Sequence, residues 1–218
     1  MRRTMAKASF YTALNLLFFA LIGTILLALT YQLTHEAIAR SVENEKLKLI
    51  SQIAPTAAYD NDIMKDTVQL APDKLLGTSE ATTAYRGRLK NQPSIAVIQA
   101  IAPDGYSGKI SLVIAIHSDG RIGGVRVVSH KETPGLGDYI EIAKSNWITV
   151  FNDASLENRK SSDWKVKKDG GTFDYVAGAT ITPRAIVKAV HKAMQYYTQH
   201  REALFANADV PTAKEKAK

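Results

Sequence analysis

Three runs of sequence determine the fold: residues 96–102 (AVIQAIA), 109–116 (KISLVIAI) and 121–130 (RIGGVRVVSH). Each is rich in β-branched and apolar residues with the period of two that is typical of a strand. Turn sequences separate the runs, Pro103-Asp104-Gly105 in the first gap and Ser118-Asp119-Gly120 in the second. Strands joined by such short turns pair as antiparallel neighbours. The sequence therefore predicts an antiparallel meander.

Helical patterns follow the sheet. A glycine-rich loop, residues 132–138 (ETPGLGD), comes directly after the third run. We expect Asp138 to cap a helix that continues to Phe151, and Thr182 to cap a final helix with Pro183 at its first position. Helices beside an antiparallel sheet make an α+β fold. The apolar stripe expected to bury the final helix is formed by Ile186, Val190, Ala193, Met194 and Tyr197.

The regions outside these patterns are less regular. Residues 36–53 (EAIARSVENEKLKLISQI) are expected to form a helix that continues from the N-terminal segment and ends before Pro55. Residues 56–92 are mixed and polar, and no element is predicted there. Residues 206–218 are small and charged, which predicts a disordered tail.

An apolar segment lies near the N-terminus. Residues 8–34 contain no ionisable side chain except tyrosine, and a helix of residues 10–33 would cross the roughly 30 Å hydrocarbon core of a bilayer. A cleaved signal peptide is the alternative, because residues 37–39 (AIA) resemble a cleavage site. The run is longer than the roughly 7–15 apolar residues of a signal peptide. We therefore expect an uncleaved transmembrane helix.

The charges beside this segment predict its orientation. Arg2, Arg3 and Lys7 precede the apolar run, whereas the charges just after it nearly cancel. Positive residues favour the cytoplasmic side, so residues 1–9 are expected in the cytoplasm and the main domain outside. In a Gram-negative cell this would be a single-pass inner-membrane protein with a periplasmic domain.

Composition excludes several classes of function. The chain of 218 residues has a formal net charge of +7, but acidic and basic residues are interspersed, which argues against nucleic-acid binding. The absence of cysteine excludes disulfides and cysteine-ligated iron–sulfur clusters. The five histidines lack the spacing of metal ligands, and no paired carboxylates indicate acid–base catalysis. We expect neither a metal site nor an independent catalytic site.

Residues 174–184 (DYVAGATITPR) could hold a phosphate. Gly178 and Ala179 leave room beside the hydroxyl of Thr180, and the expected helix starts two residues later. The positive end of a helix favours phosphate, and Arg184 could add a charge-assisted contact. The residues alone favour the simpler alternative, a loop that only caps a core helix.

Residues 132–137 could border a planar ligand. Glycines allow close approach of the backbone, Leu136 could pack on a ring, and Glu132 and Thr133 could hydrogen-bond to its edge. A connector whose glycines only satisfy turn geometry explains the segment equally well.

Three segments, in order, resemble the G subunit of the Rnf (Rsx) electron-transport complex: residues 102–110 (APDGYSGKI), 130–138 (HKETPGLGD) and 167–187 (KKDGGTFDYVAGATITPRAIV). The N-terminal anchor matches as well. The resemblance implies an FMN-binding domain, here residues 93–205, behind a connecting region of residues 34–92.

The family joins FMN by a phosphoester to the last threonine of the pattern Asp-x-x-Ser/Thr-Gly-Ala-Thr. The pattern falls on Asp174, Gly178, Ala179 and Thr180, with Ala177 in place of the usual serine or threonine. The resemblance implies that a flavin transferase attaches the cofactor, with Asp174 as part of what it recognises. The residues expected to bind FMN are Thr180, Asp174, Gly178, Ala179, Thr182, Arg184, Glu132, Thr133 and Leu136.

The implied function is that of an electron-carrying subunit of a membrane translocase that couples electron transfer to ion movement. Its partners would be the other membrane subunits and the iron–sulfur subunits of the complex. Two alternatives stay open. One is the related C subunit of the sodium-translocating NADH:quinone reductase, and the other is a flavin-free assembly subunit in which Thr180 is unmodified.

Overall fold

The computed structural model describes residues 2–206 and divides the chain into two units, residues 1–46 and 47–218. The first unit is part of helix α1 (Arg2–Ile53). The segment Lys7–Ser41 has a mean hydropathy of 2.3, and its apolar window is not buried inside the protein. An apolar helix of this length with no protein cover fits a membrane span. The expected disordered tail lies outside the described residues, except for Ala206.

The four threonine hydroxyls of this segment are satisfied within the helix. The hydroxyls of Thr12, Thr24, Thr30 and Thr34 each donate to the carbonyl four residues earlier, at 2.8–3.0 Å. Such bonds leave no hydroxyl proton of these threonines unpaired in a lipid environment. The helix extends to Ile53 and ends before Pro55, as the sequence predicts.

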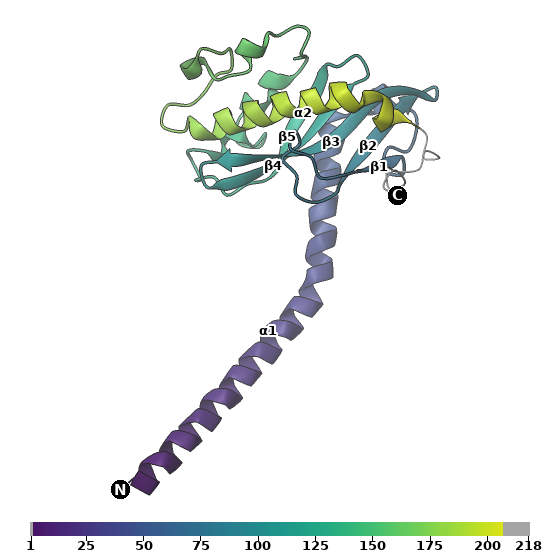
Figure 1. Ribbon diagram of the computed structural model, residues 1–218. Helices are drawn as coiled ribbons and strands as arrows, with labels where there is room; N and C mark the ends of the chain where they lie inside the picture. The colour runs from purple at the N-terminus through teal and green to yellow at the C-terminus, as the bar shows by residue number, and fades with distance from the viewer. Residues whose placement is uncertain (1, 207–218) are drawn as a thin grey trace, which may run out of the picture. The chain divides into compact units, whose positions relative to one another are not determined.

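The second unit contains a five-stranded antiparallel sheet in which the strands lie side by side in chain order (Figure 1). Its strands are β1 (Thr67–Leu70), β2 (Thr82–Leu89), β3 (Gln92–Gly105), β4 (Gly108–His117) and β5 (Ile122–Ser129). The predicted meander is confirmed as β3–β5. The region for which no element was predicted supplies β1 and β2.

The first predicted turn is wrong by a few residues. Strand β3 continues through Pro103 to Gly105, and the turn is formed by Tyr106 and Ser107. The register between β3 and β4 is irregular from Ala102 to Gly105. A proline is tolerated at such an irregularity because no regular ladder bond is lost there. The second turn, at residues 118–120, lies where it is expected.

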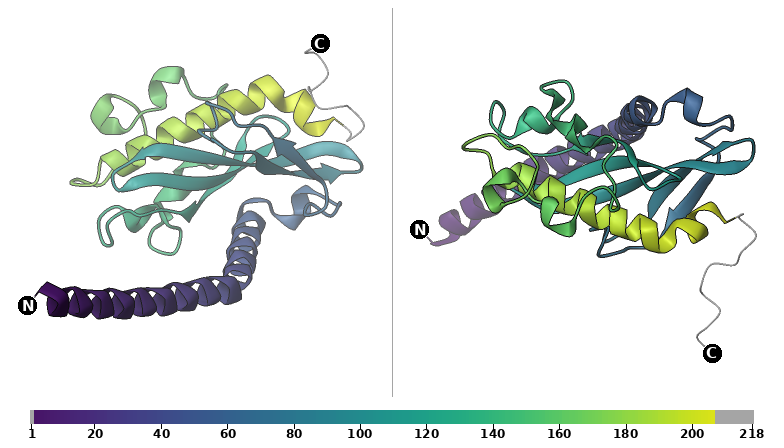
Figure 2. Two further views of the ribbon diagram at one scale, coloured as in Figure 1. Left: turned by 60° about the horizontal axis from the view of Figure 1, so that its bottom comes forward. Right: turned by 90° about the horizontal axis from the view of Figure 1, so that it is seen from above.

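The two faces of the sheet pack against different elements. Helix α2 (Ile181–Phe205) lies over one face of the sheet (Figure 2). Ile98 and Ile114 belong to the core cluster that includes the buried residues of α2. On the other face, Ile95 and Val113 pack in one cluster with the last turn of α1 and with Ala54, which follows it. Alternate strand residues point to opposite faces, so one sheet serves both cores.

Helix α2 confirms the expected buried stripe, because Ile186, Val190, Ala193, Met194 and Tyr197 are all buried. Its start differs from the prediction. The N-cap residue is Thr180, and Thr182 lies inside the helix with Pro183. The Thr182 hydroxyl does not cap the helix because it donates to the carboxylate of Glu132.

The prediction of one continuous helix from Asp138 to Phe151 is also wrong. The segment forms two short 3₁₀ helices, η2 (Asp138–Ile140) and η3 (Asn146–Phe151). Asp138 accepts a hydrogen bond from the backbone N–H of Gly135 at 2.8 Å, so it closes the preceding turn. Ser145 caps the second piece instead. Three further 3₁₀ helices are η1 (Thr56–Ala58), η4 (Ser161–Asp163) and η5 (Lys167–Asp169).

Candidate functional site

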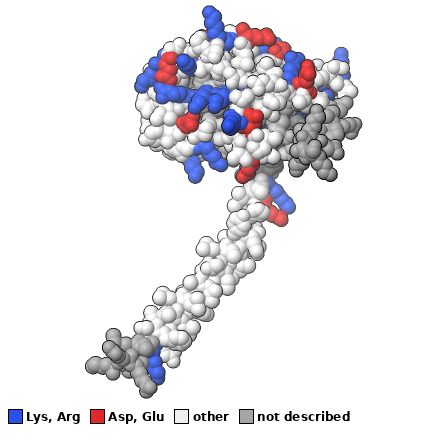
Figure 3. All heavy atoms as spheres, in the orientation of Figure 1, with Lys and Arg blue, Asp and Glu red and all other residues white. Residues whose placement is uncertain are grey.

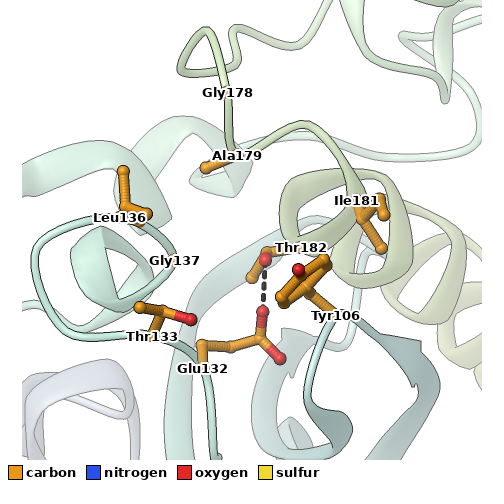
Figure 4. Close-up of a pocket in the computed structure, with 9 residues that line it drawn as sticks. All are labelled: Tyr106, Glu132, Thr133, Leu136, Gly137, Gly178, Ala179, Ile181 and Thr182. Carbon is orange, nitrogen blue, oxygen red and sulfur yellow. Dashed lines mark hydrogen bonds between the residues drawn. The ribbon is translucent and has the colours of Figure 1, made fainter.

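A pocket of about 290 Å³ lies between the β3–β4 turn, the loop after β5 and the start of α2 (Figure 4). Its volume is at the small end of the roughly 300–1,000 Å³ of ligand pockets. The two segments that the sequence analysis singled out therefore meet at one place. The lining residues are Tyr106, Glu132, Thr133, Leu136, Gly137, Gly178, Ala179, Ile181 and Thr182.

The rim of this pocket carries three exposed side chains that are aromatic or aliphatic. Tyr106, Leu136 and Ile181 are 68, 53 and 44 % exposed. Exposed apolar groups gathered around a concavity are typical of a ligand site. Sequence reasoning expected Leu136 here but missed Tyr106 and Ile181. The missed signal was a tyrosine at the tip of a hairpin that the sequence placed too early.

Glu132 forms the floor of the pocket and is only 4 % exposed. One carboxylate oxygen accepts from the backbone N–H of Ser107 at 3.0 Å, and the other accepts from the hydroxyl of Thr182. A Cβ atom on Gly137 would lie 2.9 Å from the Glu132 Cβ, and one on Gly105 would lie 3.0 Å from its Oε1. The two glycines therefore leave the space that the carboxylate occupies. Glu132 ties the β3–β4 turn, its own loop and α2 together.

His130 fixes the start of the loop. Its Nδ1 accepts from the backbone N–H of Glu132 at 3.0 Å, and its Nε2 lies 2.6 Å from the carboxylate of Glu141. Since Nδ1 is the acceptor, the proton of the neutral ring lies on Nε2 and is donated to Glu141. This arrangement holds the backbone that presents Glu132 to the pocket.

Two threonines at the start of α2 have different environments. Thr180 is half-buried, and its hydroxyl makes no hydrogen bond to any residue in the described part of the chain. Thr182 is 1 % exposed and is bonded to Glu132. Gly178, with φ of +87°, brings the chain into the helix with open space on its side-chain face. Of the two hydroxyls, that of Thr180 is the one free to react.

The start of α2 also offers free backbone donors. The N–H of Arg184 bonds to the carbonyl of Thr180 at 3.3 Å, and Pro183 has no N–H. The N–H groups of Ile181 and Thr182 have no partner among residues 2–206. Free N–H groups at the positive end of a helix bind anions. A phosphate on Thr180 would lie beside them.

Arg184 is not directed at this anion site in the structure. Its guanidinium donates to both carboxylate oxygens of Asp169, at 2.6 and 2.7 Å, and it does not line the pocket. This bond to Arg184 lowers the pKa of Asp169 below its usual value. The expected phosphate contact of Arg184 would require that pair to open.

Asp174 lies outside the pocket lining as well. Its carboxylate is 2.5 Å from Nζ of Lys167 and mostly exposed, and its carbonyl accepts from the indole N–H of Trp147 at 2.8 Å. The backbone is held while the side chain faces solvent. The position therefore suits recognition by another protein better than contact with a ligand in the pocket.

Comparisons with known proteins match both parts of the chain. The model of the FMN-binding domain family matches residues 105–195, and that of the RnfG N-terminal region matches residues 3–53. Several relatives are named as the G subunit of an ion-translocating oxidoreductase complex, among them a protein of Pseudomonas aeruginosa strain UCBPP-PA14. It is 47 % identical over 205 residues, 94 % of each chain.

Two further relatives carry the same name. The protein of Aliivibrio fischeri strain ES114 is 44 % identical over 204 residues, 94 % of this chain and 95 % of the relative. That of Vibrio cholerae strain M66-2 is 45 % identical over 186 residues, 85 and 88 % of the two chains. Identity of this extent, together with the match to the N-terminal region, decides between the two families that the sequence left open. The chain belongs to the family of G subunits of ion-translocating Rnf oxidoreductase complexes and contains an FMN-binding domain.

Proposed function

We propose that the chain carries FMN as a phosphoester on Thr180 and relays electrons within a membrane complex that couples electron transfer to ion translocation. The observation that carries this proposal is the free, half-buried Thr180 hydroxyl at the start of α2. Thr180 does not itself line the apolar-rimmed pocket, but its chain neighbours Ala179 and Ile181 do. The neighbouring Thr182 is buried and committed to Glu132, so it offers no competing hydroxyl.

The residues present fit the cofactor. A phosphate on Thr180 would supply the acceptor that the N-cap side chain does not provide, next to the free N–H groups of Ile181 and Thr182. Tyr106 and Leu136 supply apolar surface for the ring system, and Glu132 supplies a buried polar floor. When bound, FMN supplies the redox chemistry, and the protein supplies its position and surroundings.

Attachment needs a second protein in this proposal. A flavin transferase that uses FAD would break the bond between the two phosphates and form the bond between phosphorus and the Thr180 oxygen. The hydroxyl proton is lost and AMP leaves. Asp174 is exposed outside the pocket, which suits recognition by that enzyme.

The complex and its location complete the proposal. The other membrane subunits and the iron–sulfur subunits of an Rnf complex are the expected partners, because the relatives are named as subunits of such a complex. The apolar segment of α1 would anchor the chain in the inner membrane, and Arg2, Arg3 and Lys7 favour a periplasmic position for the domain.

Mass spectrometry of the chain made together with the flavin transferase tests attachment. We expect an added mass of one FMN less one water, located on the peptide that contains Thr180. Thr180→Val should fold and reach the membrane without flavin, whereas Thr180→Ser retains a hydroxyl and should keep at least part of it. Thr182→Val should keep the flavin on its folded fraction.

Two other results would contradict attachment of FMN to Thr180. Flavin lost in Thr182→Val and kept in Thr180→Val would exchange the roles of the two threonines. A wild-type chain that reaches the complex without any added mass would be the flavin-free assembly subunit.

A further inference from the structure

A second concave site, of about 230 Å³, lies farther along α2 than the FMN pocket. Three lysines from two regions of the chain surround it: Lys74, Lys188 and Lys192. Figure 3 shows Lys and Arg side chains gathered over the N-terminal half of α2. The rest of its lining is largely apolar and consists of Leu75, Gly77, Ile101, Pro103, Asp104, Ala185 and Ala189.

The charges in this lysine pocket are only partly neutralised. Lys188 is paired with Asp104 at 2.5 Å, and Lys188 together with Lys192 lowers the pKa of that carboxyl. The side-chain ammonium groups of Lys74 and Lys192 make no ion pair or hydrogen bond with any residue that the structure describes. Within the described chain, two ammonium groups therefore face an apolar-floored concavity without a counter-charge of their own.

The basic surface extends from the lysine pocket toward the FMN pocket. Arg184, Lys188 and Lys192 are spaced four residues apart on α2, which places them on one side of the helix. Asp169, the partner of Arg184, also lies close enough to Lys165 and Lys168 for their charges to lower its pKa. We name these five basic residues together with Lys74 the basic face of α2.

We infer that the basic face of α2 is the docking surface for an acidic partner protein, one of whose carboxylate side chains enters the lysine pocket. The face is too wide for a single small anion to cover. The apolar part of the lining suits the methylene stem of a Glu or Asp side chain, and the ammonium groups of Lys74 and Lys192 suit its carboxylate. Charge complementarity of this kind orients an encounter and raises its rate.

The basic face of α2 lies close to the pocket proposed to hold FMN. Lys188 follows Thr182 by six residues, which is about 9 Å along the helix axis. A partner on this face therefore lies next to the FMN pocket, where its redox group could approach the flavin. This consequence rests on the proposed attachment of FMN to Thr180, but the docking itself does not.

The test uses the full chain, with flavin attached, in zwitterionic nanodiscs. The binding partner is the Rnf complex purified from a strain that lacks this subunit. We expect wild-type affinity to fall about tenfold when salt rises enough to shorten the screening length from about 10 Å to a few Å. Lys74→Glu/Lys192→Glu should weaken binding at least about tenfold at low salt and remove most of the salt dependence.

The matched control is Lys65→Glu/Lys90→Glu, which changes the net charge equally. Lys65 is an exposed residue near β1, and Lys90 lies in the β2–β3 turn, at the end of β3 far from Pro103. The control should bind within about twofold of wild type. Lys74→Ala/Lys192→Ala, which removes charge without reversing it, should give an intermediate loss. Measurements of flavin content and thermal melting test whether each variant is folded.

Three outcomes would overturn the inference. The first is equal binding by the pocket and control variants. The second is unchanged binding to the complex together with Lys74- and Lys192-dependent binding to vesicles of anionic lipid, which would make the face a lipid contact. The third is binding of inorganic phosphate alone, with no effect on the complex. A wild-type chain without flavin would refute the FMN proposal and leave this comparison valid.

Discussion

The hydrogen bond between Thr182 and Glu132 makes a sharp prediction for the variant Thr182→Val. Valine has nearly the same shape as threonine, so the substitution removes a hydroxyl without creating a cavity. Thr182 is 1 % exposed and Glu132 is 4 % exposed. One oxygen of a carboxylate that has little contact with solvent therefore loses its partner.

The expected cost follows from the charge and burial of the acceptor. Hydrogen bonds to charged groups contribute about 1.5–3 kcal/mol, and an unsatisfied buried acceptor belongs at the upper end of that range. We expect Thr182→Val to lower the free energy of unfolding by about 2–3 kcal/mol. A residue that only capped the helix would cost about 1 kcal/mol. Thr182→Ser keeps the hydroxyl and loses a methyl group, so it should cost about 1 kcal/mol.

Glu132→Gln is the second substitution of a double-mutant cycle with Thr182→Val. The amide oxygen of glutamine can accept from the Ser107 N–H, and its NH₂ group can donate to the Thr182 oxygen, so both contacts re-form. Because the acceptor charge is gone, Thr182→Val should cost less in this background. The coupling in the double-mutant cycle should be about 1 kcal/mol or more.

Urea unfolding of the chain in detergent, followed by tryptophan fluorescence, measures these differences. Trp147 and Trp164 both lie in the domain and report on its packing. A cost of about 1 kcal/mol or less for Thr182→Val, with no coupling to Glu132→Gln, would refute the reasoning and restore Thr182 as a simple cap.

Three further predictions concern the pocket proposed to hold FMN, the membrane topology of the chain and the pH dependence of its stability. Leu136→Ala should leave FMN attached but shift its absorption or redox potential. Unchanged values would mean that residues 132–137 only connect two elements and do not contact the flavin. A phosphatase fused after Lys218 should be active, and a fluorescent reporter that folds only in the cytoplasm should be dark there; the opposite pair would reverse the topology. Burial lowers the pKa of His191, which stacks on Trp164 with ring centroids 5.1 Å apart. Its stabilising contribution should be complete above pH 6.5 and be lost as the pH falls through the folded-state pKa, and NMR titration should place that pKa below 6.5.

Local patterns in the sequence predicted the anchor, the last three strands and the final helix, because each has a clear apolar pattern. Strand β2 was missed because its apolar period is interrupted by Arg86 and Arg88. Arg86 is buried because it pairs with Asp66 at 2.5 Å and donates to the carbonyl of Ala206 at 2.7 Å. These partners are distant in sequence, so no local pattern reveals them.

The same limit applies to the site. The sequence singled out both segments of the pocket but assigned the cap to Thr182, because a Thr-Pro pattern is interpreted from spacing alone. The structure gives Thr182 a partner fifty residues away in sequence. Asp138 shows the same effect on a shorter scale, since its bond to the Gly135 N–H replaces the cap that spacing predicts.

Helix α2 is held at both ends by hydrogen bonds, which fixes the position of Thr180 at its start. Glu132 ties its first turn to the sheet and the pocket loop, while Arg86 and Arg88 bind the carbonyls of its last residues at 2.7–3.5 Å. Thr180 is therefore fixed relative to the sheet, whereas the rim residues Tyr106 and Leu136 stay more than half exposed. A cofactor attached at Thr180 would have a rigid base and an open edge. Rapid electron exchange with a docked partner needs both properties, because position must be kept while access is not blocked.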